Sequence, residues 1–352
     1  MIVTFVCPSA PHPVGGVIAF YEFANALVRR GHVVHLVHAP FFRNRIDSLD
    51  DLAWFRFDPR IEHHVSDLAT SLPPADILFG RSDDPAHGLP VTLIQGVEML
   101  HVGLERDAFR SRSLKVCIAS WLIDVGQRFG VDADQFEVVH MGIDQDRYRV
   151  LTPIDDRGPV VGILYSSHEA KGWEVGVDAL DIAHRKVPDL QVLAFGTARP
   201  PGTLPDWISF HLDPPQDQLV SELYNRCAAF VQSSHYEGFG FSAVEAMACG
   251  AALATTDNGG SRDYAFHGRT ALVSAPGDPD ALAASIIALL SDRALRTRVA
   301  LAGRDVAGGL SWDQAGADLE ACLVRYLADP AAYQHEPGPE VPGEGFDGFA
   351  LR

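Results

Sequence analysis

One stretch of the chain, from Ser233 to Gly250, reads SSHYEGFGFSAVEAMACG and guides the interpretation of the rest. It follows the apolar run Cys227–Gln232, which predicts a short buried strand, and its second half is rich in good helix formers. We therefore expect a strand, a glycine-rich turn and then a helix that opens near Ala243. Glu237 would lie in the turn and Glu245, eight positions later, in the first turn of the helix.

The turn has the properties of a site for an anionic ligand. The two glycines of Gly238–Gly240 let the backbone approach a ligand closely, and free amides at a helix start favour a group such as a diphosphate. A purely structural interpretation is also open, because Ser242-x-x-Glu245 is the pattern of a capping box. Capping would explain Glu245 but neither Glu237 nor the glycines, and the two interpretations of Glu245 are compatible.

Composition places the chain among globular proteins. Its 352 residues suffice for two ordinary domains, and it has 47% hydrophobic and 21% charged residues. No run of about 18 apolar residues occurs, and Met1–Cys7 resembles a strand rather than a signal peptide. We expect a cytoplasmic protein without stable membrane insertion, and the net charge of −18 argues against binding to nucleic acid.

Neither a metal site nor a disulfide framework is expected. The five cysteines are scattered and lack C-x-x-C spacing, which favours reduced, buried thiols. The fifteen histidines include His32, His35, His63 and His64, but none belongs to an H-E-x-x-H motif. The sequence therefore predicts an activity that needs no cofactor and no metal.

Apolar strands alternate with amphipathic helices in both halves of the chain, which predicts parallel sheets covered by helices. The first half has expected strands at Ile2–Cys7, His32–Val37, Ile77–Phe79, Val91–Ile94 and Val116–Ala119, and a helix from Val17 to Arg30. The second half has expected strands at Val160–Leu164, Gln191–Phe195, Ala228–Gln232 and Ala252–Thr255, followed by the helix-rich Pro279–Ala307. Both halves are thus expected to be doubly wound α/β domains that bind ligand at the carboxyl ends of their strands.

The expected domain boundaries follow from local composition. The polar segment Asp144–Pro159 is interpreted as a linker, which gives an N-terminal domain at 1–148 and a C-terminal domain at 149–310. A last helix is expected within 311–330. The tail 331–352 is rich in proline, glycine and glutamate, so we expect it to be flexible or to lie over the surface.

The segment that contains Glu237 and Glu245 resembles the E-x7-E signature of the retaining glycosyltransferases of family 4, the group 1 glycosyltransferases. The resemblance implies an α/β fold of GT-B architecture, with two Rossmann-like domains that face each other across a cleft and a C-terminal helix that packs back on the first domain. The N-terminal domain would bind the acceptor and the C-terminal domain the nucleotide-sugar donor. It further implies that the first glutamate lies near the transferred sugar, that the second binds the ribose, and that Gly238, Phe239 and Gly240 contact the donor.

Two further motifs resemble family motifs that contact the donor diphosphate. Gly15 and Gly16 are similar to the glycine-rich loop near the donor phosphates, although they would also suit an ordinary strand-to-helix turn. Lys171-Gly172 is similar to the pair whose lysine neutralises the diphosphate, with a solvated surface lysine as the alternative. The resemblance therefore implies that Lys171 is catalytic together with Glu237.

The chain also departs from the commonest family pattern. Ser166 lies in the segment where an arginine usually precedes the lysine, and the segment Leu93–Glu98 lies where many members have a histidine. We expect Ser166 to contact the donor and Arg262 to help neutralise the phosphates. Both departures resemble a subset associated with rhamnose and other deoxysugars. Glu98 and His101 are expected to contact sugar or acceptor, with a structural role as the alternative for His101.

The resemblance as a whole implies a metal-independent retaining glycosyltransferase. It would move a sugar from a nucleotide-diphosphate sugar to a hydroxyl of a glycan, a lipid-linked or a small-molecule acceptor, and cationic groups would stabilise the departing diphosphate. Two other functions stay open: a GT-B sugar-nucleotide epimerase, and a non-catalytic partner that only binds nucleotide sugars. The sequence leaves open the acceptor, the donor base and sugar, the oligomeric state, and the choice between front-face attack and double displacement through Glu237.

Overall fold

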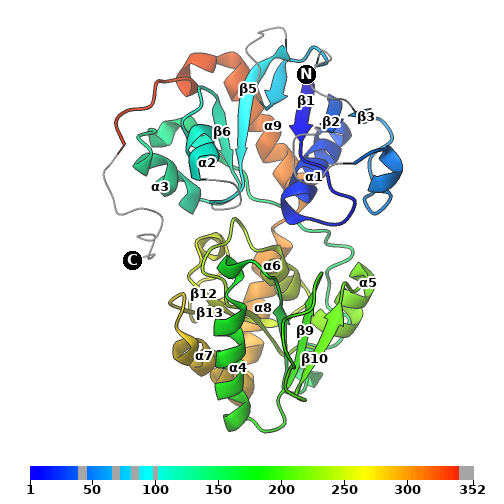
Figure 1. Cartoon of the computed structure of the whole chain (residues 1–352), viewed down its shortest axis with the longest axis vertical. Helices are drawn as coiled ribbons and strands as arrows, with labels where there is room; N and C mark the ends of the chain where they lie inside the picture. Colours follow the sequence, from blue (N-terminus) through cyan, green and yellow to red (C-terminus); the bar gives the residue numbers. More distant parts are fainter. Residues whose placement is uncertain (39–45, 66–71, 81–86, 98–101, 341–352) are drawn as a thin grey trace. The chain divides into compact units, whose positions relative to one another are not determined.

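The chain folds into two compact units, each built on its own parallel β-sheet (Figure 1). The computed structural model describes residues 1–38, 46–65, 72–80, 87–97 and 102–340. Unit 1 contains Met1–Gly142 and the described residues from Trp312 onward, and unit 2 contains Ile143–Ser311. The α/β class and the two Rossmann-like sheets expected from the sequence are confirmed.

Unit 1 is a seven-stranded sheet with the strand order β3-β2-β1-β4-β5-β6-β7. The strands are β1 (Ile2–Cys7), β2 (Val33–His38), β3 (Glu62–Val65), β4 (Ile77–Phe79), β5 (Leu89–Ile94), β6 (Leu114–Cys117) and β7 (Phe136–Val138). The helices of this unit are α1 (Gly15–Arg29), α2 (Val102–Phe109), α3 (Trp121–Arg128) and α9 (Trp312–Ala328). The central strand β1 is apolar, and its Val3, Phe5 and Cys7 side chains are fully buried, as expected for a strand covered on both faces.

Unit 2 is a six-stranded sheet with the strand order β10-β9-β8-β11-β12-β13. The strands are β8 (Val160–Leu164), β9 (Gln191–Gly196), β10 (Ile208–Leu212), β11 (Ala229–Gln232), β12 (Ala252–Thr256) and β13 (Ala271–Ser274). The helices are α4 (Trp173–Lys186), α5 (Gln216–Gln218), the π-helical turn Leu219–Tyr224, α6 (Phe241–Ala248), α7 (Pro279–Ser291) and α8 (Arg293–Gly308). The strand order reverses between β8 and β11, and in open α/β sheets such a reversal is where ligands bind.

Helix α9 belongs to unit 1 although it follows unit 2 in the chain. It packs against α1, where the rings of Trp312 and Phe23 meet edge to face with centroids 5.6 Å apart. At the end of α1, Arg30 Nε donates to Glu320 of α9 at 2.6 Å, and His32 Nε2 lies 2.7 Å from the same carboxylate. The last helix therefore completes the hydrophobic packing of unit 1.

The units divide at residues 142/143 and 311/312, whereas the sequence placed the divisions after residues 148 and 310. Ile143 pairs with Ser311 in an isolated β-bridge, and the Gln145 amide donates to the carbonyls of Ala307 and Leu310. The segment Asp144–Pro159, interpreted from its composition as a linker, is therefore part of unit 2. The polar composition of the segment did not reveal its place in unit 2, because the Gln145 amide bonds to backbone carbonyls that are distant in sequence.

Of the two arrangements expected for the tail 331–352, flexible or lying over the surface, the described part takes the second. Up to residue 340 it lies on unit 1, where the Gly338 amide donates to the Gly130 carbonyl at 2.7 Å. Arg112 contacts Glu336 at 2.9 Å, and Arg106 Nε donates to Glu340 at 2.6 Å. The described part of the tail is thus ordered by paired charges, and residues 341–352 lie outside the described residues.

Most expected strands coincide with observed ones, and the differences concern polar strands and one helix start. Helix α1 begins at Gly15, two residues earlier than expected, so Gly15 and Gly16 form its first turn. Strands β3, β7, β10 and β13 were not expected; β3, for example, reads EHHV and gives no apolar signal. Tertiary pairing with a neighbouring strand, rather than local composition, makes β3 a strand.

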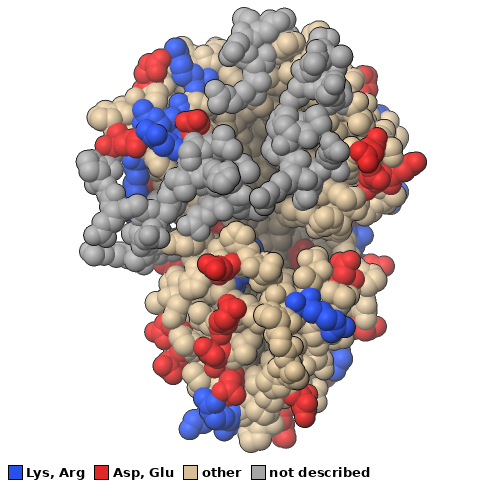
Figure 2. Space-filling model, in the orientation of Figure 1, with Lys and Arg blue, Asp and Glu red and all other residues tan. Residues whose placement is uncertain are grey.

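The surface agrees with the acidic composition. In Figure 2 the acidic and basic side chains of the described residues are intermixed with uncharged ones on the displayed face. Within the described part of the chain, no helix has both the length and the apolar character needed to cross a bilayer.

Candidate active site

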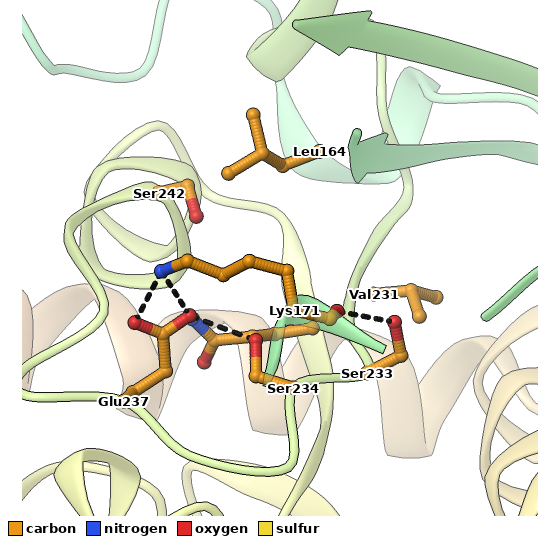
Figure 3. Close-up of a pocket in the computed structure, with 8 residues that line it drawn as sticks. Leu164, Lys171, Val231, Ser233, Ser234, Glu237 and Ser242 are labelled. Atoms are coloured by element: carbon orange, nitrogen blue, oxygen red, sulfur yellow. Dashed lines mark hydrogen bonds and ion pairs between the residues drawn. The ribbon is translucent and has the colours of Figure 1, made fainter. Parts of the chain in front are cut away.

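A pocket of unit 2 lies at the carboxyl ends of β8 and β11, where the strand order reverses. The residues that line it come from these two strands, from the loops that follow them and from the start of α6 (Figure 3): Leu164, Lys171, Val231, Gln232, Ser233, Ser234, Glu237 and Ser242. Two of them, Lys171 and Glu237, are residues that the sequence singled out. The pocket therefore has the position that the fold predicts for a ligand site.

The centre of the pocket is an ion pair between Lys171 and Glu237. Lys171 Nζ lies 2.9 Å and 2.7 Å from the two carboxylate oxygens of Glu237, toward which its side chain extends in Figure 3. Ser234 Oγ donates to Glu237 Oε1 at 2.7 Å, and Gln232 Nε2 donates to the same oxygen at 3.4 Å. Glu237 is 7% exposed and Lys171 is 33% exposed, so the carboxylate is fixed while the ammonium group is accessible from the pocket.

A tight turn holds Lys171 in this position. Lys171 ends the short 3₁₀ turn Glu169–Lys171, and Gly172 follows with a left-handed φ of 58°. A Cβ atom at Gly172 would lie 2.2 Å from the Ser233 carbonyl oxygen, so only glycine fits there. The His235 amide donates to the Ala170 carbonyl at 2.7 Å, which docks the turn on the loop that carries Glu237.

A second loop supports Glu237 from the β12 side. The Glu237 amide donates to the Asn258 carbonyl at 2.9 Å, and the Gly260 amide donates to the Glu237 carbonyl at 3.2 Å. Asn258 Nδ2 in turn donates to Gln232 Oε1 at 3.2 Å. The backbone and the side chain of Glu237 are thus fixed by different partners, so that the orientation of the carboxylate is set before any ligand binds.

The glycine-rich turn leads into α6 through Gly240. This residue is the N-cap of α6 with a φ of 94°, and a Cβ atom there would lie 2.5 Å from Tyr264 Oη. Tyr264 Oη donates to the Phe239 carbonyl at 2.9 Å, and the Phe239 side chain is only 2% exposed. A donor contact by Phe239 would therefore have to come from its backbone, because its ring is a packing residue.

Glu245 is not part of a capping box, which corrects one of the two interpretations from the sequence. The N-cap of α6 is Gly240, so Ser242 lies inside the helix and Glu245 is its fifth residue, not a residue of the first turn. Tyr224 Oη donates to Glu245 Oε2 at 2.8 Å. Burial raises the pKa of Glu245, and hydrogen bonds from Tyr224 and Tyr148 oppose that rise.

Two residues expected at the donor phosphates have other contacts. Ser166 Oγ accepts a hydrogen bond from the His168 amide at 3.2 Å and does not line the pocket. The Arg262 guanidinium is paired with Asp257, with nitrogen–oxygen distances of 2.7 Å and 3.0 Å. Lys171 is therefore the basic residue of the pocket lining.

Apart from Gly238, which lies in unit 2, the remaining expected site residues belong to unit 1. A Cβ atom at Gly16 would lie 3.2 Å from Gln95 Oε1, so Gly16 lies close to a residue of the segment Leu93–Glu98. Contact of Gly15 and Gly16 with a donor stays a prediction. Glu98 and His101 lie outside the described residues.

Sequence reasoning missed four residues that support the two glutamates: Gln232, Ser234, Tyr148 and Tyr224. Ser234 alone had a local signal, because it stands three positions before Glu237 in the motif. The others come from elements that meet only in the folded unit.

Two parallel α/β sheets, each with a reversal of strand order, define the GT-B architecture, and a charged pocket lies at the reversal of the second sheet. Residues 203–306 match the family model described as glycosyl transferases group 1. Over this region the chain is similar to the group 1 glycosyltransferases.

Two curated proteins are similar to a large part of this chain. The chain is 29% identical over 249 residues to a glycogen synthase of Mycobacterium tuberculosis, covering 66% of this chain and 58% of the relative. It is 26% identical over 245 residues to a D-inositol 3-phosphate glycosyltransferase of Xylanimonas cellulosilytica, covering 62% of this chain and 58% of the relative. The matches thus span less than two thirds of the length of these relatives.

Solved structures agree with the fold. A glycosyltransferase from Rickettsia africae ESF-5 has a TM-score of 0.73 at 19% identity, covering 93% of this chain and 99% of that chain. Anabaena Alr3699/HepE in complex with UDP-glucose has a TM-score of 0.71 at 17% identity, covering 92% of this chain and 100% of that chain.

Proposed function

We propose that this chain transfers a sugar from a nucleotide-diphosphate sugar to an acceptor hydroxyl, with retention of configuration and without a metal ion in the transfer step. The observation that carries this proposal is the Lys171–Glu237 pair, with an ordered carboxylate and an accessible ammonium group at the switch point of unit 2. The match of residues 203–306 to the model of group 1 glycosyl transferases supports the same reaction class.

Lys171 is the group that would stabilise the leaving diphosphate. Negative charge grows on that group as the bond to the sugar breaks, and a fixed cation lowers the energy of the transition state more than that of the ground state. In the structure the ammonium group is balanced by Glu237. A bound diphosphate would share it, and the positive end of the α6 dipole would also favour an anion there.

Glu237 is better arranged to stabilise positive charge than to act as a nucleophile. Its Oε1 accepts from Ser234 and Lys171, and its Oε2 accepts from Lys171. Attack on the sugar would require a carboxylate oxygen to give up these hydrogen bonds. This arrangement supports front-face attack, in which a phosphate oxygen takes the proton of the acceptor hydroxyl and Glu237 stabilises the cationic sugar ring.

Glu245 is proposed to bind the ribose of the donor. Its carboxylate is oriented by Tyr224 and can accept hydrogen bonds from vicinal hydroxyl groups. The identity of the base and sugar is a further question, and deoxysugar donors are kept as candidates because of the departures in the segments Tyr165–Ser167 and Leu93–Glu98.

The test is donor binding and turnover in EDTA-containing buffer. UDP-glucose is the first ligand because a structural neighbour was solved with it, followed by GDP-sugars and dTDP-rhamnose. Calorimetry should find one donor that binds to the wild type. Lys171→Ala should weaken that binding about 10–100-fold, since hydrogen bonds to charged groups are worth about 1.5–3 kcal/mol. Lys186→Ala, at the exposed end of α4, is the matched control and should bind normally.

Turnover separates the proposed reaction from its alternatives. Release of nucleotide diphosphate that depends on an added acceptor, and that Glu237→Gln abolishes, is the expected result. Interconversion of the donor sugar without an acceptor would point to an epimerase. Equal donor affinity in Lys171→Ala and wild type would contradict the proposed site.

A further inference from the structure

Histidines and a glutamate gather on the edge ribbon of the unit 1 sheet, which strands β2 and β3 form. In the parallel register His35 lies beside Glu62 and Val37 beside His64. Because side chains alternate between the two faces of a sheet, His35, Glu62 and His64 share one face. His38 and His63 lie on the opposite face, where their side chains form a separate stacked pair.

The three side chains on the first face converge on one point. His35 Nδ1 lies 3.2 Å from His64 Nε2 and 3.3 Å from Glu62 Oε2, and the three ligand atoms all lie within 4.8 Å of one another. A tetrahedral ion with metal–ligand distances of about 2.0–2.1 Å has ligand atoms about 3.3–3.4 Å apart. Two of the three separations therefore match the edges of such a site.

A hydrogen-bond network explains this arrangement less well. His35 Nδ1 faces Glu62 Oε2 and His64 Nε2 at almost equal distance, and a single N–H group cannot point at both. Without a proton on that nitrogen, its lone pair would face the negatively charged Glu62 oxygen directly. A cation between the three groups would satisfy every lone pair at once.

Accessibility also suits a metal ligand set. The side chain of His35 is 13% exposed and that of Glu62 is 62% exposed, so the group is anchored in the sheet and open to solvent.

We propose that His35, Glu62 and His64 bind a divalent transition-metal ion, with Zn²⁺ as the best match and water in the remaining position. Two imidazoles and one carboxylate form a known type of zinc ligand set, whereas Mg²⁺ and Ca²⁺ prefer oxygen ligands alone. The ion would fasten the short edge strand β3 to β2. All residues that line the donor pocket belong to unit 2, so this site is compatible with metal-independent transfer.

The test uses the full chain after removal of metal with EDTA and desalting. Titration with Zn²⁺ against a chromophoric chelator should give one tight site per chain, and Co²⁺ should give the intense visible absorption of a tetrahedral ion. Glu62→Gln and His64→Gln should each weaken Zn²⁺ binding by more than about tenfold, because even residues that only hydrogen-bond to metal ligands are worth about 10–100-fold.

The matched control is His63→Gln, adjacent in the chain but on the opposite face, and it should bind Zn²⁺ as the wild type does. Glu62 is exposed, so Glu62→Gln should keep the thermal midpoint of the metal-free wild type and report on binding alone. Equal Zn²⁺ affinity in Glu62→Gln, His64→Gln and wild type would overturn the proposal. So would the absence of a tetrahedral Co²⁺ spectrum in the wild type.

Discussion

Burial shifts the protonation equilibria of Glu245 and His38 toward their neutral forms. Glu245 lies on α6, the helix that carries the pocket residue Ser242, and its pKa is raised because burial disfavours the carboxylate. His38 in unit 1 is 3% exposed, and burial together with His63 and His64 lowers its pKa to about 4. The first shift concerns the proposed function, and the second concerns the stability of unit 1.

Replacing Glu245 with glutamine should separate ligand binding from stability. A raised carboxyl pKa means that ionisation of Glu245 opposes folding. The stability that the protonated carboxyl group contributes is therefore present at low pH and is lost as pH rises through the folded-state pKa. At pH 7 Glu245→Gln should therefore unfold at the same or a higher denaturant concentration than the wild type. The gain in the free energy of unfolding is about 1.4 kcal/mol for each unit by which the pKa of Glu245 is raised. Near pH 4 the difference should vanish.

Donor affinity is the second measurement on the same variant. If Glu245 binds the ribose, calorimetry should find Glu245→Gln at least about tenfold weaker, since a charge-assisted hydrogen bond is worth about 1.5–3 kcal/mol. Unchanged affinity in a stably folded variant would limit Glu245 to a structural role with Tyr224.

His38 should make unit 1 sensitive to acid. A lowered histidine pKa means that the stabilising contribution is complete above the ordinary value of 6.5 and is lost as pH falls through about 4. The difference between the ordinary and the lowered pKa of His38 corresponds to about 3 kcal/mol in the free energy of unfolding. His38→Gln, which can keep the hydrogen bond to Ser9, should lose correspondingly less stability than wild type between pH 7 and pH 4 in denaturant titrations. Parallel pH curves for the two proteins would contradict this account.

At the scale of elements, the turn before α4 positions Lys171, the lysine proposed to stabilise the leaving diphosphate. Gly172→Ala should destabilise the chain by more than about 3 kcal/mol, because a left-handed φ of 58° is strained for alanine and its Cβ would meet the Ser233 carbonyl. Gly268→Ala is the matched control: its φ is 74°, but a Cβ there has open space. We expect it to cost only the conformational strain of about 1–2 kcal/mol.

Chemical denaturation of both variants, followed by donor titration, measures the two effects. Gly172→Ala should also lose donor affinity, since the adjacent Lys171 moves with the turn, while Gly268→Ala should not. Equal losses of stability in both variants would show that the structure relieves the contact between the new Cβ atom and the Ser233 carbonyl without any loss of stability.

Apolar elements could be predicted from the sequence, and helix starts less well. The strands Ile2–Cys7, Ile77–Phe79 and Val160–Leu164 coincide with the prediction because a continuous apolar run is itself the signal for a buried parallel strand. The start of α6 was misplaced because Ser242 suited an N-cap, whereas Gly240 takes that position through a turn that Tyr264 supports. Such tertiary support has no local pattern.

The same distinction holds for the sites. Glu237 and Lys171 could be singled out because each lies in a motif, although nothing in the sequence gives their 2.7 Å contact. The cluster of His35, Glu62 and His64 depends on the register of β2 against β3. A shift of one residue would put the ligands on opposite faces, so the histidines alone did not predict a metal site.

At the scale of the whole molecule, all residues that line the donor pocket lie within 143–311. This segment contains the complete six-stranded sheet of unit 2, whereas unit 1 needs α9 from beyond it. We therefore expect the fragment 143–311 to fold alone and to bind the donor nucleotide within about tenfold of the full chain. At 100 times its dissociation constant the nucleotide should stabilise the fragment by about 2.7 kcal/mol.

The fragment 1–142 is the counterpart, and it should not fold cooperatively. It lacks α9, so Phe23 loses its contact with Trp312, and the charged end of α1 loses Glu320. Joining residues 312–340 to this fragment through a flexible linker should restore a cooperative transition, because these residues supply the missing face. If 1–142 folds without them, α9 is not required for the core of unit 1. If 143–311 folds but binds no nucleotide, the donor site needs residues of unit 1, for which Gly15 and Gly16 are the first candidates.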